Sequence, residues 1–407
     1  MSDRPLRLGL RENLAQFWLL VAVNAFVGAM VGLERSTLPL IGEKDFGLAK
    51  ATTNLGAGAL AERVGRRRLL IAGWVMALPV PLLVAAAPSW SWVVAANVLL
   101  GVNQGLAWSM TVVMKVDLVG PRRRGFALGL NESAGYGGVA IAALISGWLA
   151  GELAARDVLV VGSAVIAGAA LIISVLFVRD TAGHVALEQA RDHPDDGDEA
   201  PGLGEAFADA TFRRPALRAC SQAGLVNNLN DALAWGLVPL FLAARGAGAA
   251  QIGLVAALYP AIWGLGQLWT GHWSDRVGRK PLIVAGMLVQ GGALSGLALS
   301  DGRVAPAAAS AVILGLGTAL VYPTLLAAIS DAVSPVARAP AVGVYRFWRD
   351  MGYVVGALLA GLLADAVGYS GAIGVVAALT AASGVWVAAD LSERRLPRRG
   401  PASSLAP

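Results

Sequence analysis

The chain has 407 residues, of which 56% are hydrophobic and only 14% are charged, and its mean hydropathy is +0.63. These values lie far from those of soluble globular proteins and indicate a membrane protein. The net charge of +5 is no sign of nucleic-acid binding, because the placement of the cations along the chain accounts for it. The single cysteine, Cys220, excludes an internal disulfide.

About a dozen apolar runs are long enough to cross a bilayer as helices. The sequence therefore predicts an all-α integral membrane protein built from two six-helix bundles, residues 1–178 and 217–407. The second run is doubtful because its start is polar. The expected spans are 15–40, 45–61, 69–87, 90–119, 125–150, 157–178, 217–243, 249–272, 281–299, 304–332, 339–365 and 369–391.

Cations are distributed unevenly between alternate loops. Twenty-three of the 32 Lys and Arg residues fall in the two termini and in loops after even-numbered spans, whereas five fall in the opposite loops and four inside spans. Lys and Arg are retained in the cytoplasm, so both termini are expected on the cytoplasmic side of the cell (inner) membrane. The start, Met1 to Gln16, carries three arginines and no cleavage site, and we interpret it as a cytoplasmic N-terminus rather than a signal peptide.

The segment between the two halves, residues 179–216, has a different composition. It contains nine acidic residues against four basic ones. Such a polar segment cannot bury a core of its own, so a solvated cytoplasmic linker is expected here.

The two halves align with each other, but the offset changes along the chain. It is 200 residues between Pro39 and Pro239, 213 between Gly58 and Gly271, and 214 between Asp117 and Asp331. The first half thus lacks thirteen residues before Gly58, and the remaining stretch from Gly42 to Lys50 is polar. We expect helix 2 to be unusually short and packed against helices 4 and 11, with Lys50 on the outer side or in the cavity.

One decapeptide is repeated. Residues 271–280 read G-H-W-S-D-R-V-G-R-K, and residues 58–67 read G-A-L-A-E-R-V-G-R-R. The glycines permit a tight turn and a close approach of two helices. The carboxylates of Asp275 and Glu62 can meet neighbouring cations or a helix N-terminus, so we interpret the loop as a conformational latch rather than only a basic inside loop. The expected latch residues are Gly58, Glu62, Arg63, Gly65, Arg66, Gly271, Asp275, Arg276, Gly278 and Arg279.

This repeated loop resembles the G-x-L-a-D-r-x-G-r-[RK] loop of the major facilitator superfamily, with one departure at Glu62, where the family usually has Asp. The resemblance covers essentially the whole chain and implies a transporter of two six-helix halves. Asn103-Gln104-Gly105 resembles the Gln-Gly core of the family's second motif, although Gly101 stands where that motif has Arg. Residues 129–138 are glycine-rich like the antiporter motif but lack its Gly-Pro pair, and both departures weaken a case for proton-driven drug antiport.

Ionisable and polar residues at membrane depth are costly, so they are candidates for the pathway of a substrate or a proton. Four carboxylates against four cations allow the group to be neutral, as buried charges must nearly be. The expected pathway residues are Glu34, Arg35, Asn103, Gln104, Lys115, Glu132, Asn227, Asn228, Asp231, Arg346, Arg349 and Asp350.

The roles of these residues stay open at this point. Arg346 and Arg349 share a helix face, and they either bind an anionic substrate or neutralise Asp350 and a second carboxylate. Lys115 and Glu132 either form a structural ion pair or belong to the pathway. Asp231 is the best proton carrier, because carboxylates at functional sites are often tuned to exchange a proton; pairing with helix 11 and plain helix packing are its alternatives.

These features favour a secondary active transporter of a small solute that works by alternating access, is coupled to protons and exports its substrate. The sequence contains no P-loop or nucleotide fingerprint, and no nucleophile–base or metal-ligand cluster, so no enzyme activity, cofactor or metal is expected. The expected partners are the small-molecule substrate, the lipid bilayer and protons, with no nucleic acid, and the chain is expected to be a monomer. The alternative is a transport-deficient or receptor-like membrane protein of the same fold, which the short helix 2 motivates.

Overall fold

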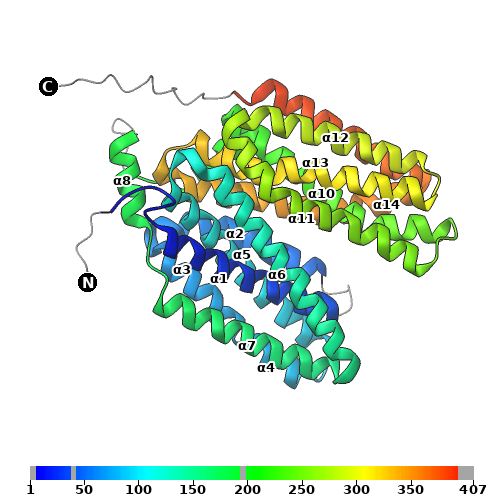
Figure 1. Cartoon of the computed structure of the whole chain (residues 1–407), viewed down its shortest axis with the longest axis horizontal. Coiled ribbons are helices and arrows are strands. Elements are labelled where there is room, and N and C mark those ends of the chain that lie inside the picture. The colour runs from blue at the N-terminus through cyan, green and yellow to red at the C-terminus, as the bar shows by residue number, and fades with distance from the viewer. Residues whose placement is uncertain (1–5, 38–42, 193–198, 393–407) are drawn as a thin grey trace.

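The structure is a computed structural model that describes residues 6–37, 43–192 and 199–392. Every regular element in these ranges is a helix (Figure 1). The first half contains α1 (Leu14–Thr37), α2 (Glu43–Val64), α3 (Arg66–Ala77), α4 (Pro79–Ala86), α5 (Trp90–Val119), α6 (Arg124–Glu152) and α7 (Ala155–Leu176). The connection contains α8 (Ala182–Asp192) and α9 (Leu203–Ala208), and the second half contains α10 (Pro215–Ala244), α11 (Ala249–Val277), α12 (Arg279–Leu299), α13 (Val304–Ala332) and α14 (Arg338–Asp390).

The helices gather into two groups. Figure 1 shows α1–α7 in the lower part of the molecule and α10–α14 in the upper part, with α8 at the left. This confirms the predicted all-α fold with two helical halves, while the exact domain limits at residues 178 and 217 stay a prediction. Close packing within each half depends on glycine: a Cβ on Gly28 of α1 would lie 1.8 Å from the carbonyl oxygen of Gly135 on α6, and one on Gly352 of α14 would lie 2.0 Å from that of Leu225 on α10.

Eight helical segments in the described ranges are long and apolar enough to cross a membrane. They are Leu14–Leu33, Arg66–Ala86, Ser91–Val119, Arg156–Leu176, Gln251–Val277, Arg279–Leu299, Val304–Ala332 and Pro335–Asp390. The second combines α3 with α4, which are separated at Leu78 because Pro79 and Pro81 supply no backbone N–H. The last contains two helices that meet at Gly368, whose φ of 74° suits glycine, between the two expected spans 339–365 and 369–391. The count of about twelve spans stays a prediction.

Helix α2 is longer than the sequence led us to expect. It has 22 residues, whereas its counterpart α11 has 29. At 1.5 Å per residue α2 measures about 33 Å, which matches a hydrocarbon core of about 30 Å. It is therefore shorter than α11, but a helix too short to cross the bilayer is not confirmed. It does lie against α5 and α14, where Gly58 meets Gly343 backbone to backbone.

The connection between the halves is not solvated throughout, because part of α8 and Ala206 of α9 are buried against the rest of the molecule. Val185, Glu188 and Ala206 are buried, and the ring of Phe207 lies tilted against that of Trp348, with 5.9 Å between the ring centres. Glu188 can be buried although the segment is polar, because it forms ion pairs with one arginine of each helical half, and these offset the cost of burying its charge. The acidic run from His193 to Asp198 lies outside the described residues.

Candidate functional site

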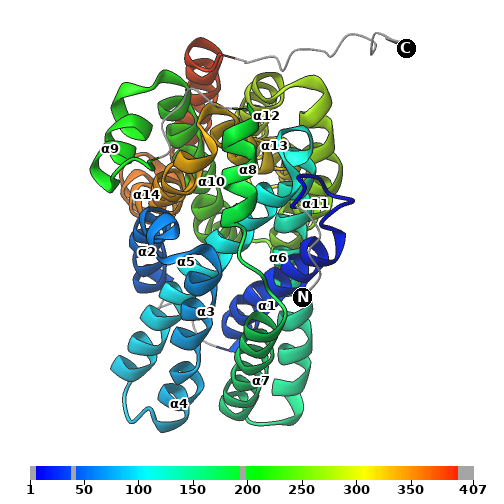
Figure 2. The same cartoon turned by 90° about the vertical axis from the view of Figure 1, so that its left-hand side faces the viewer.

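One end of the molecule, at the left of Figure 1, carries both repeated loops and α8. We call it the latch face. Figure 2 looks on to this end and shows α8 in front of the seam between the two halves. The charged side chains that form its network of ion pairs are Glu62, Arg66, Asp117, Arg124, Glu188, Asp275, Arg279, Asp331 and Arg338.

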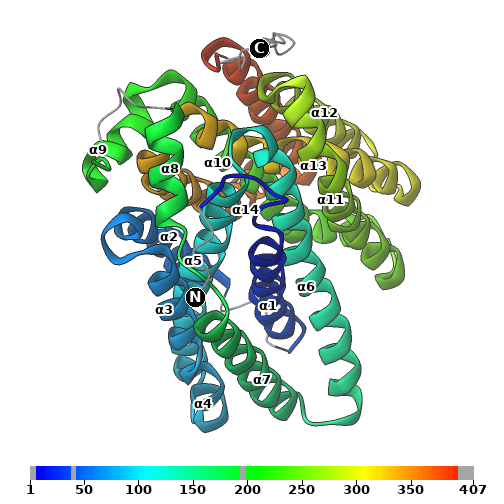
Figure 3. The same ribbon diagram turned by 60° about the vertical axis from the view of Figure 1, so that its left-hand side comes forward.

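The second copy of the loop caps a helix of the opposite half. The Asp275 carboxylate accepts hydrogen bonds from the backbone N–H groups of Gly125 and Phe126, both at 2.9 Å, at the start of α6. A carboxylate at a helix N-terminus satisfies orphan donors and meets the positive end of the helix dipole. Gly271 makes the approach possible, since a Cβ there would lie 2.3 Å from the carbonyl oxygen of Gly125. Figure 3 shows α6 and α11 running side by side.

The same loop also supplies a cation to a bridge across the seam. Arg279 contacts Asp275 at 2.8 Å and Asp331 of α13 at 3.0 Å. Asp331 in turn contacts Arg124 of α6 at 2.8 Å. Arginine presents several donors in a fixed fork, which is why one side chain holds two carboxylates here.

The first copy makes the related bridge in the other direction. Arg66 contacts Asp117 of α5 at 2.7 Å, and Asp117 contacts Arg338 of α14 at 3.0 Å. Glu62 contacts Arg66 at 2.5 Å, four residues further along the chain. The two bridges therefore repeat each other: a loop arginine, an aspartate of its own half and an arginine of the opposite half.

Glu188 of α8 joins the two bridges. It forms ion pairs with Arg124 of the first half and, at 2.8 Å, with Arg338 of the second half. Its side chain is 1% exposed. The latch face is thus closed by charged contacts. Some of them cross the seam, and the others hold in place the side chains that do.

The sequence-based set of latch residues is only partly brought together here. Gly65 and Gly278 begin α3 and α12 with φ of 93° and 107°, which suits glycine. Arg63 and Arg276 are exposed and lie away from the bridges. Sequence reasoning missed Arg124, Glu188 and Arg338 as latch residues; Asp117 and Asp331 had been found as a repeated pair, and the signal for the two arginines was the same, because they too are 214 positions apart.

A second group of charges lies deeper, between the halves. Asp350 of α14 contacts Arg349 at 2.7 Å and Lys50 of α2 at 3.6 Å, and it accepts a hydrogen bond from Asn54 at 2.6 Å. Arg349 therefore neutralises Asp350, which is one of the two roles predicted for the arginines; the other is to bind an anionic substrate. Lys50 takes part in this group, and neither Lys50 nor Asn54 was among the predicted pathway residues.

Arg346, one helical turn before Asp350, is in a different situation. Its side chain is fully buried, yet Nε, Nη1 and Nη2 have no hydrogen-bond partner among the residues that the structure describes. Its guanidinium carbon lies 5.9 Å from the ring centre of Trp108. A buried cation without an acceptor is costly and points to a role that this closed arrangement does not satisfy.

Aromatic rings form a continuous wall beside these cations. Tyr136 lies 5.5 Å from Trp108 and 4.2 Å from Trp263, and Trp263 lies 5.2 Å from Tyr322, measured between ring centres. Arg349 lies 4.8 Å from the ring of Tyr322. The wall contains residues of both halves, so it spans the seam.

Asp231 contacts a tyrosine of the next helix. The Tyr259 hydroxyl donates to the Asp231 carboxylate and lies 3.2 Å from the Thr318 hydroxyl. Asp231 is 3% exposed. Tyr259 had not been identified from the sequence, because nothing in its surroundings along the chain distinguishes it from an interfacial tyrosine.

Lys115 and Glu132 are connected through a third residue. Lys115 donates to Asn131 and, at 3.0 Å, to the carbonyl oxygen of Leu20. Asn131 donates to Glu132 at 2.8 Å, and Trp108 donates to the same carboxylate oxygen at 3.1 Å. The proposed direct ion pair is therefore a relay through an amide.

The predicted amides mostly hold helices together. Asn103 donates to Gly73 of α3 and Gln104 to Val27 of α1, both at 2.9 Å. Asn227 accepts from Gln290 of α12 at 3.0 Å, and Asn228 is buried on the same helix, α10. The side chains of Glu34 and Arg35 lie outside what the structure describes.

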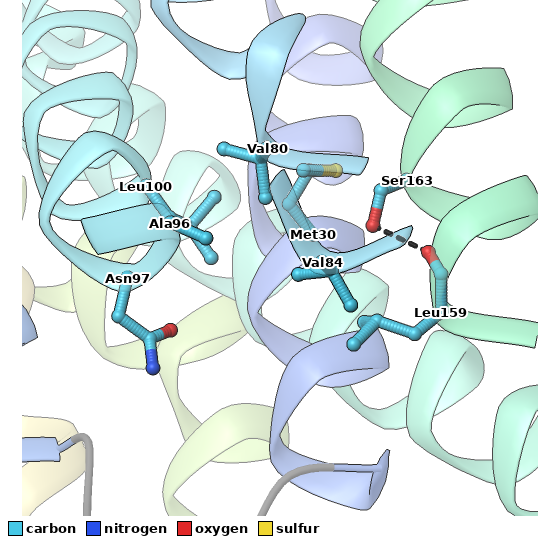
Figure 4. A pocket seen from close by; sticks show the side chains of 8 residues that line it. All are labelled: Met30, Val80, Val84, Ala96, Asn97, Leu100, Leu159 and Ser163. Atoms are coloured by element: carbon cyan, nitrogen blue, oxygen red, sulfur yellow. Dashed lines mark hydrogen bonds between the residues drawn. The ribbon is translucent and has the colours of Figure 1, made fainter. Parts of the chain in front are cut away.

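A small hollow in the first half, drawn in Figure 4, lies apart from the charges. Its lining is mainly apolar: Met30, Val80, Val84, Ala96, Asn97, Leu100, Leu159 and Ser163. The Ser163 hydroxyl is already used, because it donates to the carbonyl oxygen of Leu159 at 2.6 Å. We therefore place the candidate site at the charged and aromatic group between the halves.

Comparison with known proteins agrees with this architecture. A "Probable 4-methylmuconolactone transporter" of Cupriavidus pinatubonensis is 26% identical over 237 residues, which make up 56% of this chain and 52% of the relative, so the match spans about half of that protein. The fucose:proton symporter FucP of E. coli has a similar structure, with a TM-score of 0.75 at 14% identity over 93% of this chain and 98% of that one. The human organic anion transporter MFSD10 (TETRAN) gives a TM-score of 0.71 at 14% identity over 93% and 99%. Family comparison matches the Major Facilitator Superfamily at residues 13–221 and again at 220–406, and the chain belongs to this family.

Proposed function

We propose that the protein is a secondary active transporter that moves a small solute by alternating access between its two halves. The observation that carries this proposal is the closed latch face, where Asp275, Glu188, Arg124 and Arg338 bridge the seam in front of a buried charged group. When ion pairs of this kind separate, water can hydrate the freed charges, whereas separating an apolar interface would expose apolar surface to water. A seam of this kind suits a molecule that opens and closes.

Two further features belong to the proposal. Two buried carboxylates are available for coupling to protons: Asp231, which is bonded to Tyr259, and Glu132, which is bonded to Asn131.

The latch face is the cytoplasmic face, as the cation bias along the sequence favours, so both termini are cytoplasmic in the cell membrane. The protein acts as a monomer and works in the direction of export. The names of the relatives, a lactone transporter, a sugar symporter and an organic anion transporter, support a small organic solute.

Accessibility of a buried cysteine tests alternating access without a known substrate. In a Cys220→Ser background, Ser109→Cys places a thiol beside Asn54 at the central group, where Ser109 is 2% exposed. An impermeant thiol reagent is then added to right-side-out and to everted membrane vesicles. A transporter exposes Cys at this position from both sides, in proportions that shift when the latch is weakened by Asp275→Asn.

The matched control is Ser330→Cys, whose native serine lies under Arg124 at the latch face and is 1% exposed. It should react only from the latch-face side, in everted vesicles, which also tests the topology. Reaction of the central thiol from one side in every variant would support the receptor-like alternative instead.

A further inference from the structure

The centre of the molecule holds a set of buried donors without acceptors. They are the three guanidinium nitrogens of Arg346, Nη1 of Arg349 and the indole nitrogen of Trp263. Arg346 and Arg349 lie one turn apart on α14, and Trp263 of α11 reaches the same aromatic wall as Tyr322, whose ring lies under Arg349. Native proteins rarely leave such groups unpaired, and all of these groups call for an acceptor.

No carboxylate of the described residues takes this place. Among the described residues, no carboxylate oxygen lies within 4.0 Å of an Arg346 nitrogen, whereas Asp350 is held by Arg349, Lys50 and Asn54. Glu132 is the next carboxylate; one of its oxygens accepts from Trp108 and Asn131, and the other has no partner. Glu132 is therefore held by Trp108 and Asn131, and it forms no ion pair with Arg346 among the described residues.

Formal charges in this region also leave one cation over. The described central residues contribute Lys50, Lys115, Arg346 and Arg349 against Glu132, Asp231 and Asp350. The sequence-based balance was neutral because it did not place Lys50 in the group. One monoanion would balance the charge, whereas a dianion would overshoot it.

Resting on the transport function proposed above, we infer that Arg346 binds the carboxylate of a small, planar, apolar monocarboxylate as the transported solute. The carboxylate accepts from the guanidinium, with Arg349 Nη1 and Trp263 Nε1 as further donors, and the apolar body packs on Trp108, Tyr136 and Tyr322. Arginine matches a carboxylate in a bidentate manner, and aromatic faces suit a flat apolar body. The wall would be of no use to an inorganic anion.

Binding should be measured on the purified full chain by thermal shift, with sodium benzoate and sodium cinnamate as probes and benzamide and sodium sulfate as comparisons. We expect the two carboxylates to raise the melting temperature and the neutral amide to have no effect. Arg346→Gln should weaken binding of the carboxylates at least tenfold, because a hydrogen bond to a charged group is lost in a buried site. Arg218→Gln removes a cation of the same half that already pairs with Asp390 at 2.5 Å, and it should bind the probes like the wild type.

A second readout does not depend on the probes. Ligand-free Arg346→Gln should melt at a higher temperature than the wild type, since it removes a buried charge that has no partner. Lower stability of this variant, unchanged binding of the probes, or sulfate binding as tight as benzoate would each overturn the inference. If the carboxylates bind through Arg346 while the central thiol stays reactive from one side only, the site is correct and the transport function is wrong. If that thiol reacts from both sides but no carboxylate binds, transport survives and this inference fails.

Discussion

The two latches of this protein have the same bridge but differ in how the loop is fastened. In the second latch, Asp275 caps α6 and is nearly buried, while its aspartate partner Asp331 is 32% exposed. In the first latch the aspartate, Asp117, is fully buried, while the loop carboxylate Glu62 is 21% exposed and contacts only its own half through Arg66. In the second latch the most buried carboxylate is therefore that of the loop, Asp275, whereas in the first latch it is that of the bridge, Asp117.

The local sequence explains why the first loop does not cap its helix. The N–H groups capped by Asp275 belong to Gly125 and Phe126, and their repeat counterparts are Ala339 and Pro340. Proline has no backbone N–H, so a carboxylate there could accept from one residue instead of two. Glu62 contacts Arg66 four residues further on, as Asp275 contacts Arg279, but the structure shows no cap by Glu62 among the described residues.

The connection between the halves compensates on the first side. Thr181 donates to Asp117 at 2.8 Å, and α8 follows directly and packs over this bridge. Asp117 is therefore closed off from water, which strengthens its two ion pairs. The comparison shows that the first latch can close in spite of the departure at Glu62, because Thr181 and α8 supply contacts that the loop itself does not make.

The largest effect should come from Glu188, because it belongs to both latches. Glu188→Gln keeps the shape but leaves Arg124 and Arg338 facing each other without the shared carboxylate. Removing one partner of a buried ion pair typically costs about 3–5 kcal/mol. We expect the reaction rate of Ser330→Cys to rise at least tenfold, which corresponds to about 1.4 kcal/mol.

The exposed carboxylate Glu205 on α9 offers the control for this change. Glu205→Gln should leave the labelling rate of Ser330→Cys as it is in the parent. A wild-type rate in the Glu188→Gln variant would show that α8 covers the seam without fastening it.

Next in size is the loss of the helix cap. Asp275→Asn removes the charge from two hydrogen bonds to α6 and from the contact with Arg279. A hydrogen bond to a charged group contributes about 1.5–3 kcal/mol. The variant should insert normally, but labelling of Ser330→Cys should increase by about tenfold, and the slower cycling should be visible with the central thiol at position 109. Unchanged labelling would reduce the repeated loop to a topology signal.

Glu62→Gln sharpens the comparison because it changes the equivalent position of the other latch. Glu62 pairs with Arg66 at a spacing of four residues and is partly exposed, and such pairs contribute about 0.3–0.5 kcal/mol. Labelling of Ser330→Cys should therefore change by about twofold or less. An effect as large as that of Asp275→Asn would mean that the latches are equivalent and that the difference in capping has no consequence.

Much of this arrangement could be predicted from the sequence, and the remainder has a common cause. The repeated decapeptide placed Asp275 and Glu62 in loops that close on a neighbouring helix, because charge and glycine spacing are local signals. The contacts of Glu188 could not be predicted, since an acidic residue in a polar linker looks solvated until its two arginines are brought together from 64 and 150 positions away.

The central site shows the same limit. Sequence alone could not distinguish the two roles of the arginine pair on α14, because Arg346 and Arg349 are the same residue type on one helix face. The fold adds what the sequence lacks: Lys50 comes from a helix that was expected to be foreshortened and joins Asp350, whereas Arg346 has no hydrogen-bond partner among the described residues. Long-range pairing of this kind is visible only in the folded chain.

The smallest effect that distinguishes the two latches should be their response to acid. His184 of α8 lies on the side of the first latch, where its Nε2 contacts the Asn13 amide oxygen at 3.1 Å and its Nδ1 has no partner. Burial lowers the pKa of His184 from its usual value of about 6.5, and the charge of Asp117 only partly opposes this. A histidine with a depressed pKa binds its proton more weakly when α8 is docked than when it is detached. The free energy of docking that neutral His184 contributes is therefore fully present above the usual pKa and is lost as the pH falls below it.

In a Cys220→Ser background, Val185→Cys on α8 should react faster at pH 5.5 than at pH 7.5, by less than tenfold, after normalisation to the denatured protein at each pH. Adding His184→Gln should remove this dependence and leave Ser330→Cys at the second latch unchanged. If both thiols respond to acid alike, with or without His184, the pH effect belongs to the whole seam and not to the first latch.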